Sequence, residues 1–180
     1  MNTTPESGAP QTDDISQKQG NVEGAAPLPT LLKLTKILVP TDFSETSRKA
    51  LQYAIAFAKQ FGAKITLLHV IEPPPESEER IYAETSLEEV MRPVREQLET
   101  LATSAIESKL LDTTLVRVGV PFVIITDLAG ELEIDLVIVT THGYTGLKHV
   151  FLGSTAERIV RHAPCPVLVV REREHEFVQV

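Results

Sequence analysis

Two short polar segments of the sequence follow apolar runs and contain the residues best suited to bind an anionic ligand. The first, Pro40-Thr41-Asp42, comes directly after an apolar run, and the second extends from Thr140 to Ser154. The second segment contains Gly143 and Gly153, and glycine lets a ligand approach the backbone closely. Gly153 also precedes a predicted helix, whose free N–H groups and positive dipole end attract anions. This pattern predicts a phosphate-binding loop.

The same residues also fit an interpretation that needs no ligand. A helix dipole contributes about 0.3–1 kcal/mol per charge, so several amides and the hydroxyls of Ser154 and Thr155 must converge to hold a phosphate chain. Ser154 and Glu157 have the spacing of a capping box, in which a helix satisfies its own first amides. Spacing alone leaves both interpretations open.

The elements that must position these residues alternate along the chain. Short apolar runs predict strands at 37–39, 65–71, 115–120, 136–139 and 167–170, and apolar residues at helical spacing predict helices in the four intervals between them. Strands separated by helices require right-handed crossovers, which give an α/β fold with a parallel sheet and helices on both faces. Ligands of such sheets bind beyond the carboxyl ends of the strands, where both polar segments lie.

Local signals set several boundaries of these elements. Gly62 is placed where the first helix needs a left-handed C-terminal residue. Ser86 and Glu89 form a predicted capping box at the start of the second helix, which Pro93 should kink or restart. Pro121 is suited to the first turn of a third helix over 122–133, and a fourth helix is expected over 154–162.

Composition divides the chain into a folded domain and two tails. Residues 1–32 contain few large apolar side chains and predict a disordered N-terminal tail, because they cannot bury enough surface to offset the entropy of ordering. Residues 33–173 are expected to form the domain, and 174–180 a C-terminal tail. The acidic, Pro-rich segment 72–85 is predicted to be a mobile surface loop.

The overall charge and the single cysteine exclude several classes of function. The formal net charge is −8 and Lys and Arg form no block, which argues against nucleic-acid binding. Cys165 has no partner for an intrachain disulfide. The first residues do not resemble a signal peptide, and no apolar stretch approaches the roughly 18 residues that span a bilayer. We therefore expect a cytoplasmic protein that is not inserted into a membrane.

Several segments, in order, resemble the universal stress protein (UspA) family. The resemblance covers about residues 34–171. The matching stretches are Lys36 to Ser44, Leu67 to Val70, Val118 to Pro121, Asp135 through His142-Gly143 to Gly153-Ser154, and Ala163 to Val170.

The resemblance implies a Rossmann-like fold of the adenine nucleotide alpha hydrolase-like type. It implies strand order 3-2-1-4-5 and a homodimer that pairs through the last strand. ATP-binding members have a signature of Gly, two residues, Gly, nine residues, Gly, then Ser or Thr. On that basis Gly143, Gly153 and Ser154 would hold the phosphates and ribose. Further pocket positions implied are Pro40, Thr41, Asp42 and Val70 at the adenosine end, with Val139 and Thr155 adjoining.

The chain departs from the signature at one position, where Thr140 replaces the first glycine. A β-branched residue costs on the order of 1–2 kcal/mol where positive φ is required. Where only a small side chain is needed, a threonine fits and can donate a hydrogen bond to phosphate.

Three functions follow from these features. The favoured one is an ATP-binding, dimeric regulatory module of the stress response that a protein partner reads. The alternatives are a slow ATPase and a nucleotide-free interaction module. The sequence has no Walker A motif, GxSxG elbow or kinase loop set.

The residues that could bind a metal ion have other interpretations. Asp42 is a candidate Mg²⁺ ligand beside bound phosphates or a helix-end charge. His69, His142 and His149 lack metal-ligand spacing, which predicts packing or surface roles.

Overall fold

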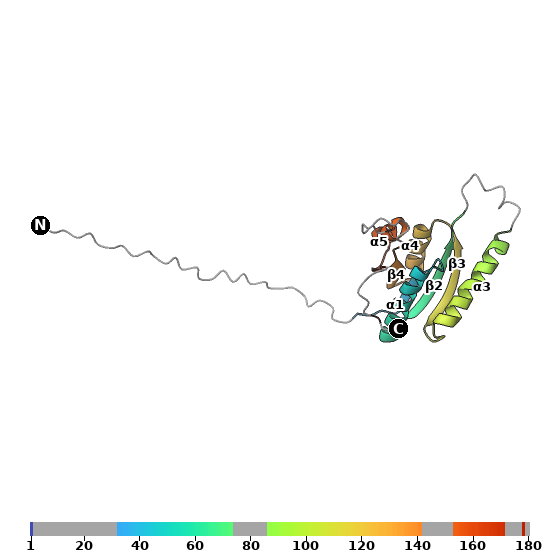
Figure 1. Ribbon diagram of the computed structural model, residues 1–180, viewed down its shortest axis with the longest axis horizontal. Helices are drawn as coiled ribbons and strands as arrows, with labels where there is room; N and C mark the ends of the chain where they lie inside the picture. Colours follow the sequence, from blue (N-terminus) through green and yellow to red (C-terminus); the bar gives the residue numbers. More distant parts are fainter. Residues whose placement is uncertain (2–31, 74–85, 142–152, 172–177, 179–180) are drawn as a thin grey trace. The chain divides into compact units, whose positions relative to one another are not determined.

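A parallel sheet of five strands forms the centre of the fold (Figure 1). The strands are β1 (Lys36–Pro40), β2 (Lys64–Ile71), β3 (Leu111–Val118), β4 (Leu136–Thr140) and β5 (Val167–Val170). Their order across the sheet is β3-β2-β1-β4-β5, and every neighbouring pair is parallel. The predicted fold class and strand order are thereby confirmed.

The computed structural model describes residues 1, 32–73, 86–141, 153–171 and 178. Nearly all of the predicted tail 1–32 therefore lies outside the described residues, as do the predicted loop 72–85 beyond Pro73 and the predicted C-terminal tail 174–180 apart from Val178. Residues 33–180 make up one unit of the chain, and the fold below is that of this unit.

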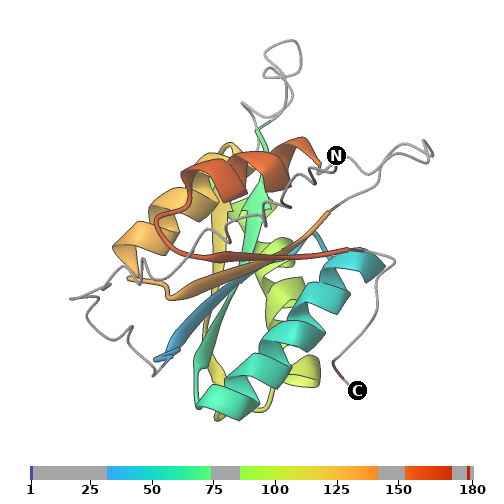
Figure 2. The same ribbon diagram turned by 90° about the vertical axis from the view of Figure 1, so that its left-hand side faces the viewer.

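Each face of the sheet is covered by two of the helices in the described residues (Figure 2). One face carries α1 (Glu45–Phe61) and α3 (Leu87–Ala105), and the other carries α4 (Pro121–Glu131) and α5 (Ser154–His162). The side chains of β1 divide between the two faces: Ile37 and Val39 belong to the core under α1 and α3, and Leu38 to the core under α4 and α5. All three are fully buried, which explains why the inner strands read as continuous apolar runs rather than as alternating patterns.

Helix α1 begins and ends at residues that suit its two termini. The Ser44 hydroxyl accepts a hydrogen bond from the Ser47 N–H at 3.1 Å, which satisfies one of the first free amides. Gly62 closes the helix with φ 72°, and its N–H donates to the Ala58 carbonyl at 2.9 Å. The predicted left-handed glycine is confirmed.

Helix α3 and strand β3 differ in part from the prediction. The capping box of Ser86 and Glu89 is present, but α3 does not restart at Pro93. Pro93 and Glu89 are both exposed, so water can satisfy the Glu89 carbonyl that lacks a proline N–H. Strand β3 begins at Leu111, four residues before the predicted start at Leu115, because an edge strand need not be apolar throughout.

Helices α4 and α5 keep close to their predicted bounds, with Pro121 as the first residue of α4. None of the helices in the described segments is both long and apolar enough to cross a bilayer.

Candidate functional site

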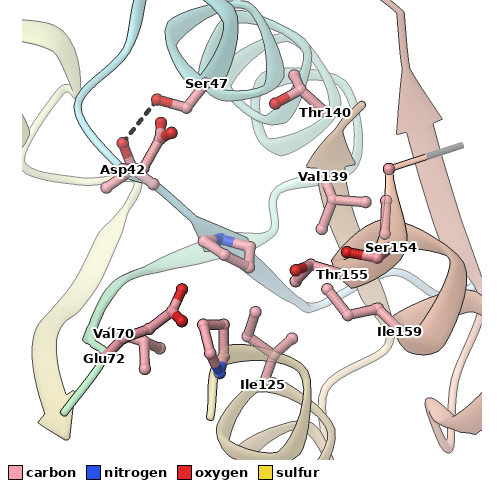
Figure 3. Close-up of a pocket in the computed structure, with 15 residues that line it drawn as sticks. Asp42, Ser47, Val70, Glu72, Ile125, Val139, Thr140, Ser154, Thr155 and Ile159 are labelled. Carbon is pink, nitrogen blue, oxygen red and sulfur yellow. Dashed lines mark hydrogen bonds between the residues drawn. The ribbon is translucent and has the colours of Figure 1, made fainter. Parts of the chain in front are cut away.

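A pocket of about 360 Å³ opens at the carboxyl ends of β1, β2 and β4 (Figure 3). The direction in which successive strands are added reverses between β1 and β4. From β1, strands β2 and β3 extend the sheet to one side, and strands β4 and β5 extend it to the other. Open α/β sheets bind their ligands at such a switch point. The residues that line the pocket are Pro40, Thr41, Asp42, Ser47, Val70, Glu72, Pro121, Ile125, Val139, Thr140, Gly153, Ser154, Thr155, Ala156 and Ile159.

Nine of the ten residues predicted for the site line this one pocket. Segments separated by about a hundred residues in sequence meet here because parallel strands end at the same edge of the sheet. The tenth, Gly143, lies outside the described residues. The structure thus brings the predicted residues together, and their part in holding a nucleotide stays a prediction.

Six lining residues were not predicted from the sequence: Ser47, Glu72, Pro121, Ile125, Ala156 and Ile159. Glu72 and Pro121 follow the ends of β2 and β3, so the strand-end rule could have found them. Ile125 lies four residues, about one helical turn, after the lining residue Pro121, and Ile159 lies four residues after Thr155. Each pair therefore shares one face of its helix. Which face of a helix points to the pocket depends on its packing, and no local pattern indicates it.

The first turn of α5 supplies backbone N–H groups that no side chain among the described residues caps. The N-cap residue is Gly153 and has no side-chain hydrogen bond, which corrects the predicted alternative of a Ser154–Glu157 capping box. Ser154 is instead the first helical residue. The first hydrogen bond within α5 runs from the Glu157 N–H to the Gly153 carbonyl, at 2.9 Å. The N–H groups of residues 154–156 come before this bond and therefore have no acceptor within the helix. Within the described part of the chain these amides have no acceptor, so they can donate to an anionic ligand.

Gly153 has φ −56° and ψ 146°, values that any L-residue can adopt. Its lack of a side chain therefore matters for space beside the helix start and not for backbone conformation.

Thr140 is the last residue of β4, one residue beyond the predicted strand end at Val139, and is paired with Val170 of β5. Positive φ outside glycine occurs, within the described ranges, only at Phe43 and Glu133. The steric penalty considered for a threonine at this position therefore does not arise. Thr140 instead lines the pocket, as do Ser154 and Thr155.

The loop between β1 and α1 forms the opposite wall and is held by its own hydrogen bonds. The Thr41 hydroxyl lies 3.0 Å from the Ser47 hydroxyl, and both residues are buried. The Asp42 Oδ1 atom accepts hydrogen bonds from the Ser44 N–H at 3.1 Å and the Ser44 hydroxyl at 2.6 Å. These contacts fix the direction in which Thr41 and Asp42 face the pocket.

Charge is unevenly distributed around the pocket. Figure 3 shows Asp42 and Glu72 on the side away from α5, whereas Ser154 and Thr155 project from the start of α5. Apolar side chains of Val70, Ile125, Val139 and Ile159 supply much of the remaining wall. An elongated ligand with an anionic end and a flat apolar end would therefore be oriented, with the anion against the first turn of α5.

The acidic groups of the pocket do not form a metal centre by themselves. Across the part of the chain that the structure describes, His, Cys, Asp and Glu side chains do not gather in groups of three that could hold an ion. A cation at Asp42 would need further ligands, which bound phosphates can provide.

Comparison with known proteins agrees with the observed fold. The model of the "Universal stress protein family" matches residues 33–171. Universal stress proteins MJ0531 and MJ0577 of Methanocaldococcus jannaschii are 35% and 32% identical to the chain, over 78% and 77% of its length and 84% and 95% of their own. The solved structure of the hypothetical protein MJ0577 has a TM-score of 0.66 and 31% identity, covering 80% of this chain and all of that one.

The match extends over the whole sheet and the four described helices, from β1 to the end of β5. The parallel sheet in order 3-2-1-4-5, the pocket at its switch point and the relatives at more than 30% identity all lead to the same assignment. This chain belongs to the universal stress protein family.

Proposed function

We propose that the pocket binds an adenine nucleotide, ATP, and that the protein works as a homodimeric regulatory module in which the bound nucleotide stabilises one state for a protein partner to read. The observation that carries the proposal is the uncapped first turn of α5, whose amides and neighbouring hydroxyls face a hollow at the switch point of the sheet. Phosphate oxygens are suited to accept from such a group of donors.

The dimensions and the polarity of the pocket fit a nucleotide. A volume of about 360 Å³ lies within the range of small-molecule sites. The phosphates would lie against Ser154, Thr155 and Thr140, and the base among the apolar residues near Val70 and Ile125. The carboxylates of Asp42 and Glu72 would repel the phosphates from the other side, which favours a single orientation. If the phosphates extend toward Asp42, a Mg²⁺ ion between them and the Asp42 carboxylate would offset this repulsion.

Proteins of the same fold have been solved with adenine nucleotides. A universal stress protein in complex with cAMP is 24% identical to this chain, and one from Archaeoglobus fulgidus in complex with dAMP is 20% identical. These complexes show that the fold can accommodate an adenine nucleotide. At this identity the assignment for the present chain depends on its own residues.

The proposed dimer is based on the two edges of the sheet. Edge strand β5, Val167-Leu168-Val169-Val170, has no charged residue, whereas edge strand β3 includes the exposed side chains of Asp112 and Arg117. Charges on an edge strand discourage pairing with another chain, and an uncharged edge permits it. Pairing β5 with the same strand of a second copy is the symmetric arrangement.

Backbone direction along β5 supports the same pairing. The carbonyls of Pro166 and Val170 accept from Val137 and Thr141, next to β4. Because backbone groups alternate in direction along a strand, those of Val167 and Val169 point to the open edge.

Calorimetric titration tests the nucleotide. We expect saturable ATP binding, and weaker binding of adenosine because adenosine lacks the phosphates that the α5 amides would hold. The absence of ATP binding would contradict the proposal and favour the nucleotide-free interaction module. Phosphate release above a control without protein, lost in Asp42→Asn, would instead support the slow ATPase.

A further inference from the structure

An aromatic pair lies directly behind the β1–α1 wall of the pocket. The His69 ring, on β2, stacks on the Phe43 ring with a centroid distance of 4.6 Å and an interplanar angle of 28°. The His69 Nδ1 atom also lies 2.8 Å from the Thr41 carbonyl oxygen. A carbonyl oxygen only accepts, so Nδ1 carries the proton and donates. His69 thus contacts two residues of the loop that bears Thr41 and Asp42.

The hydrogen bond from His69 completes the set of bonds that hold Thr41. The Thr41 N–H donates to the Leu68 carbonyl at 2.8 Å, and the Thr41 hydroxyl accepts from the Phe43 N–H at 3.1 Å and lies 3.0 Å from the Ser47 hydroxyl. The carbonyl, which accepts from His69, is the remaining polar atom. Thr41 is buried and lines the pocket, so these bonds fix the position of the wall.

Phe43 adopts a backbone conformation that needs external support. Its φ of 66° lies in the left-handed region, which is sterically unfavourable for a bulky residue. Such conformations persist where surrounding contacts hold them, and they occur frequently at ligand sites. The stack on His69 and the N–H bond to the Thr41 hydroxyl are contacts of this kind.

We propose that His69 is a positioning residue for the nucleotide pocket: by donating to the Thr41 carbonyl, it holds the β1–α1 loop in the conformation that aims Thr41 and Asp42 at the ligand. His69 touches the loop and not the pocket, because it is absent from the lining residues. The predicted effect of His69 on ATP affinity rests on the proposed function. The predicted effect of His69 on the conformation of the loop does not depend on it.

Two substitutions separate the donor from the ring. His69→Asn keeps an N–H donor near the place of Nδ1 and removes the ring, whereas His69→Phe keeps a stacking ring and removes the donor. If the donor positions the loop, His69→Phe weakens ATP binding about five- to tenfold, the worth of one net hydrogen bond. His69→Asn then binds within about twofold of the wild type on the same scale. A role in packing alone predicts the reverse order, because the ring fills the larger volume.

Amide hydrogen exchange without nucleotide supplies the independent readout. The Phe43 and Ser44 amides donate within the loop, whereas the Lys64 amide donates to the Thr35 carbonyl at the other end of the sheet and serves as the internal reference. We expect faster exchange at Phe43 and Ser44 in His69→Phe, with Lys64 unchanged and with His69→Asn resembling the wild type. If His69→Phe does not fold, His69→Leu also removes the donor to the Thr41 carbonyl and should accelerate the same two amides.

The outcomes distinguish the two proposals. Unchanged loop exchange in His69→Phe, or ATP affinity equal to that of the wild type, would overturn the role of His69 and leave the proposed function intact. If the wild type itself does not bind ATP, the proposed function fails, and hydrogen exchange alone decides whether His69 positions the loop.

Discussion

The Asp135 carboxylate accepts two hydrogen bonds from Thr35, both at Oδ2 and both at 2.7 Å, one from the backbone N–H and one from the hydroxyl. The Lys36 N–H donates to the same oxygen at 2.9 Å. These contacts join the residue before β4 to the start of β1, at the opposite end of the sheet from the pocket. The Thr35 hydroxyl, followed by the Thr35 and Lys36 backbone amides, lowers the pKa of Asp135 against the opposing effect of burial.

Acid should therefore weaken the fold through Asp135. Since the folded pKa lies below the unfolded value of about 3.9, the stabilisation is fully present above that value and is lost as pH falls through the folded pKa. We expect Asp135→Asn to lower the free energy of unfolding by about 1–2 kcal/mol at pH 7, with a smaller difference from the wild type below pH 4. Urea unfolding across this range measures both, and Asp127→Asn, at an exposed α4 position, is the control. A constant difference at all pH values would contradict the assignment.

A side chain at Gly153 should obstruct the phosphate end of the pocket. We expect Gly153→Val to weaken ATP binding at least about tenfold. Since φ −56° is accessible to valine, the loss would come from occupied space and not from backbone strain. Gly130→Ala on α4 is the matched control, because an added Cβ there meets only Pro164 Cγ at 3.9 Å. Unchanged ATP affinity in Gly153→Val, measured by calorimetry, would remove the phosphate site from the start of α5.

The hydroxyl of Thr140 can be tested separately from its methyl group. If the hydroxyl donates to phosphate, Thr140→Val should weaken ATP binding about three- to tenfold, whereas Thr140→Ser should stay within about twofold. Both substitutions keep an extended strand residue paired with Val170, so the unfolding midpoint serves as a check on the fold. Equal affinity of the two variants would show that Thr140 only fills space.

Proline at one edge of the sheet should separate the proposed dimer. The Val169 N–H faces the open edge of β5, so Val169→Pro removes a bond to a second copy and none to β4. Thr114→Pro is the matched control on the other edge strand, β3. The Gly119 N–H donates to Ile71 on β2, and because N–H groups alternate in direction along a strand, the Thr114 N–H points away from β2 to the open edge. Sedimentation should show a monomer for Val169→Pro and a dimer for the wild type and Thr114→Pro. A dimer in all three would place the interface elsewhere.

The sequence predicted the inner strands better than the edge strand β3. The apolar runs predicted for β1 and β4, 37–39 and 136–139, lie within the observed strands. Helices cover both faces of these inner strands, so side chains on either face are buried and apolar. The first residues of β3 were missed because Asp112 to Thr114 lie on an edge strand, where polar side chains are tolerated. Edge strand β5 was predicted with its observed bounds because all four of its residues are apolar, so the signal depends on an uninterrupted apolar run.

The candidate site was predictable wherever it depends on the ends of strands. Pro40, Val70 and Thr140 come directly from strand ends, so the fold class alone places them together. The choice between Gly153 and Ser154 as the N-cap residue was not predictable, since both are favoured there. The stack of Phe43 on His69 depends on a left-handed backbone conformation that glycine or asparagine, but not phenylalanine, would have indicated.

The pocket is lined from both helical layers of the domain. Ser47 belongs to α1, which packs on one face of the sheet, while Ile125 and Ile159 belong to the core on the other face. A molecule bound there would contact residues from both layers at once, and its binding energy would be shared between them. Occupancy would then suppress partial opening of either layer, so that a change in nucleotide level would be sensed as a change in the rigidity of the entire domain.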